Sequence, residues 1–565
     1  MVLVAGLLPA FLTAIRSELN DASASWGLRT LDLLSATGLD GWLQPGLKGF
    51  GNSLVHQPPL ATWLLAITTH TLGTESVISW RVVSLVATSV LIWFMYWLGR
   101  RIGGASFALI VIACLCCHPL TLQLAAGVGP AAPGLLLIVI AVWGFLGHLG
   151  GPPNLVSWQL LIGATAWGLA LLMIGPVALA LLLPMGLHVW LLRGHPDHAG
   201  TALSSGSQLL HIWLGLRGFL FYTATGLSFS GWWQIMMLSD HGLEFWNSWW
   251  TGHVVTNGTP EEARSFGPTW LSQNVFVCGL LAIGVVRVVD ELRSPSSEFM
   301  RRQCQFSLLW WLSALALRLV FDIPVLRGSV LLEAWDGFLL IPSALMVAWG
   351  VKAIVLRQTH SLIEALLIVS TFALVTWLVS NSVIMAVVAF LLGAIVIALL
   401  PSLVAHARRY AEGWKDRDWR RLMQAALAML MMGHFAIGLA LRPRSSAESA
   451  VLAELRQRMT PVPEMRRVSL VTMSGSAPES LAFLFRSQWP TAHFAVMGSW
   501  DGAVANDPPS GSVVSPVNEL VVDWARRDTR IQTEFTTDRR AQPIGDPVRF
   551  RGYKLVIYLI ERPSR

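Results

Sequence analysis

Two polar stretches of the sequence carry carboxylate, histidine and tryptophan side chains that could bind or react with a small molecule. Residues 16–58 contain four acids and end near a histidine: Glu18, Asp21, Asp32, Asp40 and His56. Residues 227–268 are dense in tryptophan and histidine and include His253. Tryptophan favours the headgroup level of a bilayer, where the ring is half apolar and its N–H stays wet. The two stretches therefore indicate a site at a membrane surface, suited to a molecule with a polar head and a lipid tail.

Arg318 is a charged side chain inside an apolar run that extends over residues 305–321. A charge inside a bilayer costs at least about 2.5–3.5 kcal/mol and normally has a partner or a function. Arg318 is therefore either a binding residue for an anionic group or one half of an ion pair. The acids close to it in the sequence are Asp322, Glu333 and Asp336.

The composition is that of a multi-pass membrane protein. Hydrophobic residues make up 54% of the 565 residues and charged residues only 13%, whereas soluble domains carry about 25% charged residues. The mean hydropathy is +0.57. The net charge of +7 could indicate nucleic acid or acidic lipid. However, the basic residues mostly lie in short connections that set membrane topology, so we expect no nucleic-acid partner.

The apolar runs predict about thirteen transmembrane helices, because a span needs about 20 apolar residues. They lie near residues 1–15, 76–98, 105–124, 131–149, 156–175, 177–192, 208–226, 270–290, 305–321, 330–351, 361–380, 382–404 and 422–441. The shorter run after Pro59 predicts a helix that dips into the membrane without crossing it. Arginines and lysines follow alternate spans, and the positive-inside rule makes that side cytoplasmic. The N-terminus is then inside, and the loops 16–58 and 227–268 lie outside.

Residues 442–565 are polar and predict a separate domain on the outside. The segments "RRVSLVTMSG" and "YKLVIYLIE" are rich in β-branched and aromatic residues and predict strands. The segment "PESLAFLFRSQW" predicts a helix with Pro478 and Glu479 in its first turn. The sequence therefore predicts an α-helical polytopic membrane domain over residues 1–441 and a small extracytoplasmic α/β domain over residues 442–565.

Five short patterns occur in the order seen in one superfamily of membrane enzymes. "DASASW" has Asp21 and Trp26 in place, and "HQPPLATWLLA" has the paired prolines before an apolar helix. The other three are "WRVVSLVATSVLIWFMYWLGRRIGG", which contains Arg81, "LLMIGPVALALLLPMGLHVWLLR" and "GWWQIMMLSDHGLEFWNSWWTGHV". On these patterns, residues 19–350 resemble the bacterial GT-C glycosyltransferases. That group includes the protein O-mannosyltransferases and the lipid A aminoarabinose transferase.

The resemblance implies a GT-C fold and the transfer of a sugar from a polyprenyl-phosphate donor to an acceptor hydroxyl, with inversion. In such a reaction a carboxylate takes the hydroxyl proton while a cation stabilises the leaving phosphate. The resemblance assigns the base to Asp21, which stands at the family's acidic position. The structural alternative is that Asp21 caps a helix beginning near Ala22. The expected partners are the lipid-linked donor, membrane lipid and an acceptor lipid, protein or glycan.

The donor or its phosphate is expected to contact His56, Arg81, His253 and Arg318, and each of these residues has a structural alternative. His56 could simply end its loop, and Arg81 could extend along the membrane interface with its charge in water. His253 could be an exposed residue of a tryptophan-rich belt. Arg318 could belong to an ion pair.

Several positions depart from the family pattern and leave a second function open. Ala22 stands where glutamate is usual, and Gln57 and Ile174 stand where lysine is common. The segment "AAGVGPAAPG" has no acid, although the family carries one between these two spans. The chain could therefore be a catalytically inactive relative that binds lipid or assembles partners. A transporter is less well supported, because the sequence shows no internal repeat and its polar residues collect at the outer surface.

The cysteines and histidines do not form a metal-binding pattern. Cys114, Cys116 and Cys117 lie within an apolar run, where cysteine acts as a small hydrophobic residue. We expect no metal and no other cofactor, and a location in a bacterial cytoplasmic membrane.

Overall fold

The computed structural model describes the chain in several segments. The helical segments are 21–35, 42, 58–73, 77–149, 157–192, 205–254, 266–295, 297–321 and 332–355. The later segments are 467–472, 483, 493–497, 517–525, 541–543, 548–550 and 553–562. The chain divides into two compact units. Unit 1 contains residues 1–11, 85–125 and 130–440, and unit 2 contains residues 12–84, 126–129 and 441–565.

The described part of unit 1 is helical throughout. Helix α5 (Val77–Gly103) crosses from unit 2 into unit 1 at residue 85. The helices that follow are α6 (Ala105–Cys117), α7 (Pro119–Ala126), α8 (Ala131–Leu149), α9 (Trp158–Ile174), α10 (Pro176–Leu179), α11 (Leu182–Leu192), α12 (Ser205–Val254), α13 (Phe266–Arg293), α14 (Glu298–Phe321) and α15 (Leu332–Val355). Each span predicted between residues 76 and 351 overlaps at least one of these helices. The spans predicted at 1–15, 361–380, 382–404 and 422–441 lie outside the described residues.

Three described helices are long and apolar enough to cross a membrane. They are Ile78–Gly103, Ala131–Leu149 and Ala334–Lys352, and the bent pair α6–α7 would add a fourth. The other described helices of unit 1 are shorter or carry more polar residues. The structure therefore supports a multi-pass membrane protein, while the predicted number of about thirteen spans is not confirmed.

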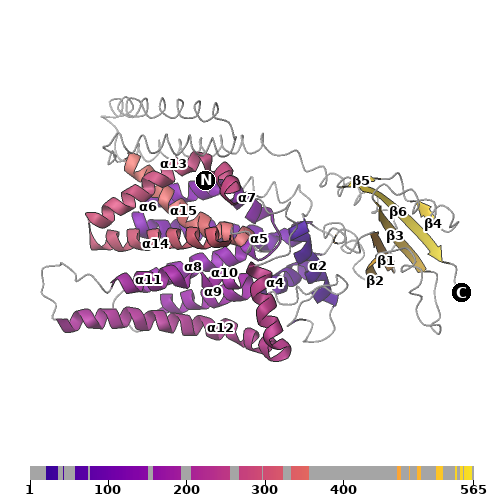
Figure 1. Ribbon diagram of the computed structural model, residues 1–565, viewed down its shortest axis with the longest axis horizontal. Coiled ribbons are helices and arrows are strands. Elements are labelled where there is room, and N and C mark those ends of the chain that lie inside the picture. Colours follow the sequence, from indigo (N-terminus) through magenta and orange to yellow (C-terminus); the bar gives the residue numbers. More distant parts are fainter. Residues whose placement is uncertain are drawn as a thin grey trace, which may run out of the picture. The chain divides into compact units, whose positions relative to one another are not determined.

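Figure 1 shows helix α15 beside α6, α13 and α14 in unit 1. Its neighbours are α6, α8, α13 and α14. Of its most apolar 18 residues, 89% are buried inside the protein, compared with 44% for α5. Aromatic rings join α15 to two neighbours, since Trp349 lies 4.8 Å from the Phe107 ring of α6 and Phe338 lies 6.3 Å from the Trp310 ring of α14. Apolar helices that are buried on all sides belong to the interior of a bundle.

Glycines let three helix pairs of unit 1 approach to backbone contact. A Cβ atom on Gly144 of α8 would lie 2.7 Å from the Cα of Gly163 in α9. A Cβ on Gly226 of α12 would lie 2.9 Å from the carbonyl oxygen of Ala164 in α9. A Cβ on Gly284 of α13 would lie 3.2 Å from the backbone nitrogen of Gly350 in α15. Small residues at such crossings are typical of helix packing in membranes.

Helix α12 corrects one expectation about the loop at 227–268. The helix extends from Ser205 to Val254, so residues 227–254 are helical. It is interrupted at Gly242, whose φ of 58° and ψ of −145° are not helical. Only glycine adopts this backbone conformation without strain. The sequence could not show the helix, because its tryptophans and polar residues do not form an apolar run.

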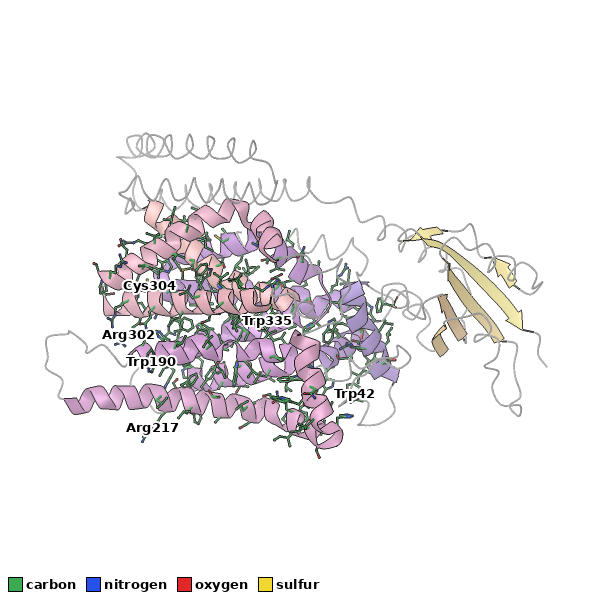
Figure 2. The ribbon with its side chains drawn as sticks, viewed as in Figure 1. Trp42, Trp190, Arg217, Arg302, Cys304 and Trp335 are labelled. Carbon is green, nitrogen blue, oxygen red and sulfur yellow. The ribbon has the colours of Figure 1, made fainter. Side chains whose placement is uncertain are left out.

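Two arginines, Arg217 and Arg302, lie near one end of the unit 1 helices. Figure 2 shows Arg302 at the beginning of α14 and Arg217 in the first part of α12, near the same end of the bundle as Trp190 of α11. The predicted topology, which depends on the alternation of spans, stays a prediction.

The described part of unit 2 includes the short helices α2 (Asp21–Ser35) and α4 (Leu60–Leu72) and the beginning of α5. Helices α2 and α4 pack against each other. Helix α4 begins directly after Pro59, and the Trp63 nitrogen donates a hydrogen bond of 3.0 Å to the Pro59 carbonyl oxygen. The prolines therefore start a helix, as predicted. With 13 residues, α4 is shorter than the roughly 20 residues of a membrane span.

The C-terminal part of unit 2 contains a mixed β-sheet. Its strands are β1 (Arg467–Thr472), β2 (His493–Met497), β3 (Val517–Ala525), β4 (Ala541–Pro543), β5 (Val548–Phe550) and β6 (Tyr553–Arg562). The order is β2-β1-β3-β6-β4, with β5 also paired to β6. Strand β1 is parallel to β2 and β3, and β6 is antiparallel to β3. The two predicted strands are β1 and β6. Of the helix predicted from Pro478, only Phe483 is described.

Candidate functional site

Asp21 is the first residue of α2, a backbone position that suits both the base and the helix cap that the sequence allows. Its side chain lies outside the described residues. The backbone thus confirms that a helix begins here and leaves the chemical role of the carboxylate as a prediction.

Helix α2 is buried on every side over part of its length. Residues 26–33 are all buried, including Arg29 and Asp32. An interfacial helix keeps its charged face in water, whereas Arg29 and Asp32 of α2 lie inside unit 2.

Arg29 is a buried cation that the sequence did not single out. Its side chain is 1% exposed, and its guanidinium carbon lies 5.0 Å from the centre of the Trp26 ring. The hydroxyl of Thr30 donates to the Trp26 carbonyl oxygen at 2.8 Å. Arginine over an aromatic face gains a cation–π attraction, which is stronger where water is excluded. No motif marks Arg29, because its burial depends on helices that are distant in the sequence.

Arg81 lies in the first turns of α5 and is 3% exposed. The alternative of an interfacial side chain with its charge in water is therefore wrong, because such a residue would expose its guanidinium. Together with Arg29 and Asp32, Arg81 gives the described part of unit 2 three buried charged side chains. Buried charges need partners or ligands, since taking them out of water is costly.

Phe483 joins the C-terminal part of unit 2 to its helices. The Phe483 ring meets the Trp80 ring edge to face, with 5.0 Å between centroids. A Cβ atom on Gly27 of α2 would overlap the Phe483 ring, so the glycine makes room for this contact. Trp80 and Phe483 are both buried. The contact places residue 483 beside Gly27 of α2 and Trp80 of α5.

The segment between α7 and α8 contacts helix α2. Gly129 has a φ of 147°, and a Cβ atom at this position would lie 3.0 Å from the Cδ1 atom of Trp26. This is the segment in which the family carries a second acid. Here Trp26 packs against its backbone, so the contact is apolar.

Ile174 stands where the family commonly has a lysine, and its side chain is completely buried. It packs against Gly134, at which any Cβ atom would overlap the isoleucine side chain. Ile174 thus fills apolar space between α8 and α9.

Arg318 forms an ion pair, which confirms the structural alternative given for it, and its contact with the donor phosphate stays a prediction. Its Nε donates to Oδ1 of Asp336 at 2.7 Å. The Arg318 side chain is 4% exposed and that of Asp336 is 27% exposed. Asp336 is one of the three acids that the sequence offered, and the side chains of Asp322 and Glu333 lie outside the described residues.

The side chains of the two predicted histidines, His56 and His253, are not described by the structure. His56 lies outside the described residues. His253 is in the last turn of α12, and its side chain lies outside the described part of the chain. Within the described residues, no group of three or more histidine, cysteine, aspartate or glutamate side chains could hold a metal ion.

Known proteins resemble the chain in sequence over one segment and in fold over nearly all of it. Residues 56–220 match the family Dolichyl-phosphate-mannose-protein mannosyltransferase. The crystal structure of ArnT from Cupriavidus metallidurans bound to undecaprenyl phosphate is similar with a TM-score of 0.55 and 15% identity, covering 99% of this chain and 97% of that one. The apo structure of the same ArnT gives the same values.

A more distant likeness is to the apo oligosaccharyltransferase of Archaeoglobus fulgidus, with a TM-score of 0.47 and 11% identity over 93% of this chain and 69% of that one. No curated protein sequence matches the chain.

The fold and the matched segment together define the class: this is a multi-pass membrane protein with the GT-C fold. The resemblance predicted from the sequence is confirmed. Residues 56–220 are similar to the mannosyltransferase family, and the fold of the chain is similar to that of ArnT.

Proposed function

We propose that the protein transfers a sugar from a polyprenyl-phosphate donor to an acceptor hydroxyl on the extracytoplasmic side of the membrane. The observation that supports this proposal is which segments make up unit 2. This unit joins the beginning of α2, the proline-initiated helix α4, Arg81 and residues 126–129 in one compact body. These are the segments to which the resemblance assigns the reacting groups. The similar ArnT structure contains undecaprenyl phosphate, which supports a lipid-linked donor.

In this reaction Asp21 acts as the base. The acceptor oxygen forms a bond to the anomeric carbon and gives its proton to Asp21. The bond between that carbon and the phosphate oxygen breaks on the opposite face, and the phosphate leaves with the electron pair. Cations stabilise the charge that develops on the phosphate. Arg81 is the family-matched candidate, and Arg29 adds a second buried guanidinium in the same unit.

The C-terminal residues 442–565 form an extracytoplasmic domain in this proposal. Its described sheet begins at Arg467, and Phe483 packs on Trp80 and Gly27. The domain would therefore cover the helices that carry Asp21 and Arg81. A lipid-linked donor presents its phosphate at headgroup depth, so a cover on that side would exclude water from the reaction.

A catalytically inactive, lipid-binding relative is the second candidate. Two observations favour it. Ile174 fills apolar space where the family commonly has a lysine, and Trp26 packs against Gly129 where the family carries an acid. The chain therefore lacks a cation that would act on a phosphate and an acid that would act on a hydroxyl.

Transfer by purified protein from polyprenyl-phosphate sugars tests the proposal. Asp21→Asn retains size and hydrogen bonding but removes the base, so we expect a loss of at least about 100-fold in rate with lipid binding retained. Asp290→Asn, which changes an exposed acid in the last turns of α13, serves as the control and should transfer normally.

Each other outcome separates the candidates. An unchanged rate in Asp21→Asn would assign the base to another acid. A variant that fails to fold would identify Asp21 as a structural cap. A wild type that binds polyprenyl phosphate but transfers no sugar would favour the inactive relative.

A further inference from the structure

A continuous aromatic stripe lies on the outer face of α5, α8 and α9 within unit 1. The rings of Trp93 and Phe94 are 5.3 Å apart, and Phe94 lies 6.0 Å from Trp143 of α8. Trp143 lies 5.8 Å from Trp158 of α9, and Trp93 lies 6.4 Å from Trp97. The stripe therefore consists of Trp93, Phe94, Trp97, Trp143 and Trp158.

The stripe faces away from the protein. Trp93, Trp97 and Trp158 are 48%, 41% and 62% exposed. Helix α5 is the least buried of the apolar helices that could each cross a membrane alone, with 44% of its most apolar window buried. A large exposed apolar surface on a membrane helix meets lipid or another protein.

Two arginines terminate the stripe at the end of α5. The guanidinium carbon of Arg100 lies 5.4 Å from the centre of the Trp97 ring, and Arg100 is exposed. Arg101 donates from Nη2 to the Gly147 carbonyl oxygen at 3.2 Å, which ties it to the last turn of α8. A Cβ on Gly147 would lie 2.6 Å from the Gln159 side-chain oxygen. The amide of Gln159 therefore lies at the same place, at the beginning of α9.

This arrangement has the two parts of a phospholipid site. Aromatic rings offer a surface on which an acyl chain can lie, and arginine binds phosphate through charged N–H donors with matching geometry. An arginine over an indole ring gains a cation–π attraction and can still donate N–H groups to an anion. The positive-inside rule puts Arg100 and Arg101 on the cytoplasmic side, where anionic headgroups attract basic residues.

A second copy of the chain would fit the stripe less well than lipid. Dimers are usually two-fold symmetric, and both copies share one orientation in the membrane. The axis would then run along the membrane normal and bring Arg100 and Arg101 of both copies to the same depth beside the interface. Like charges at an interface oppose association.

We propose that this stripe and the Arg100–Arg101 pair bind an anionic phospholipid of the cytoplasmic leaflet. The lipid phosphate contacts Arg100, with Arg101 and Gln159 beside it, and one acyl chain lies along Trp97 and Trp93. The site is separate from the proposed transfer reaction and does not depend on it.

Native mass spectrometry of the purified protein, titrated with phosphatidylglycerol or phosphatidylcholine, tests the site. We expect phosphatidylglycerol to bind more tightly. Arg100→Gln should weaken that binding about fivefold, the effect of one basic residue near an anionic surface. Arg293→Gln is the matched control, because Arg293 is also an exposed arginine in the last turn of a helix. It should bind like the wild type.

A second pair of variants tests the aromatic part. Trp97→Leu should weaken phosphatidylglycerol binding, while Trp190→Leu, at another exposed tryptophan, should not. Arg100→Lys should bind phosphatidylglycerol better than Arg100→Gln does. This order would show that the loss in Arg100→Gln comes from the missing charge and not from a general folding defect. Equal binding of the two lipids, or equal losses in Arg100→Gln and Arg293→Gln, would overturn the proposal. A dimer that Trp97→Leu converts to monomer would assign the stripe to a second copy instead.

Discussion

At the residue scale, the Arg318–Asp336 pair shows how a membrane helix carries a charge. Arginine retains its proton under all ordinary conditions, whereas a carboxylate can take up a proton and become neutral. The two partners are therefore not equivalent. Removing Asp336 leaves a guanidinium that stays charged inside the protein. Removing Arg318 leaves a carboxylate that can take up a proton and become neutral.

We accordingly expect Asp336→Asn to destabilise the protein more than Arg318→Met. Breaking a fully buried pair costs roughly 3–5 kcal/mol, and about 2–3 kcal/mol is expected for Asp336→Asn because Asp336 remains partly exposed. Denaturant unfolding in detergent measures the difference. In the double variant Arg318→Met, Asp336→Leu, part of the stability should return. Equal losses in the two single variants would contradict this account.

At the element scale, glycines decide how closely the helices of unit 1 approach. Gly226 of α12 faces α9, where the Trp167 ring and the Ala164 carbonyl oxygen occupy the space that a Cβ atom would need. Gly231, also in α12, has no atom within 4 Å of such a Cβ. Gly226 therefore lies at a close contact between helices, whereas Gly231 of the same helix lies beside open space.

Gly226→Ala should therefore cost about 1–3 kcal/mol through overpacking, because a backbone carbonyl cannot turn aside as a side chain can. Gly231→Ala should be neutral or stabilise by up to about 1 kcal/mol, since alanine is the better helix former. Denaturant unfolding of the two variants measures the difference in stability. If Gly231→Ala lost as much stability as Gly226→Ala, neither helix propensity nor packing would explain the roles of these glycines.

Sequence patterns predicted the elements of this protein better than its contacts. The apolar runs located the helices between residues 76 and 351, and the paired prolines located the beginning of α4. The continuation of α12 beyond residue 227 was missed, because tryptophans and polar residues obscure the apolar signal. The burial of Arg29 could not be predicted, since it depends on packing within unit 2. The pairing of Arg318 was predicted from the cost of an isolated charge, although three acids were possible partners.

At the scale of the whole molecule, the predicted topology has a direct test. In a background without the five native cysteines, a cysteine at Ser476 should react with an impermeant reagent added outside intact cells. A cysteine at Ser294, between α13 and α14, should react only after the membrane is opened. The reason is the one-sided distribution of arginines. The reverse labelling pattern would refute the topology.

Helix α15 has a consequence for the order in which the chain is made. It is the last described helix of unit 1, yet it contacts α6, α8, α13 and α14. Until a ribosome has produced residue 355, Gly284 of α13 and Phe107 of α6 have no Gly350 or Trp349 to meet. By contrast, α8 and α9 can pair as soon as both have entered the membrane. Half-synthesised chains therefore carry an unfilled interior, and a nascent polypeptide released before α15 should be a substrate for membrane quality control.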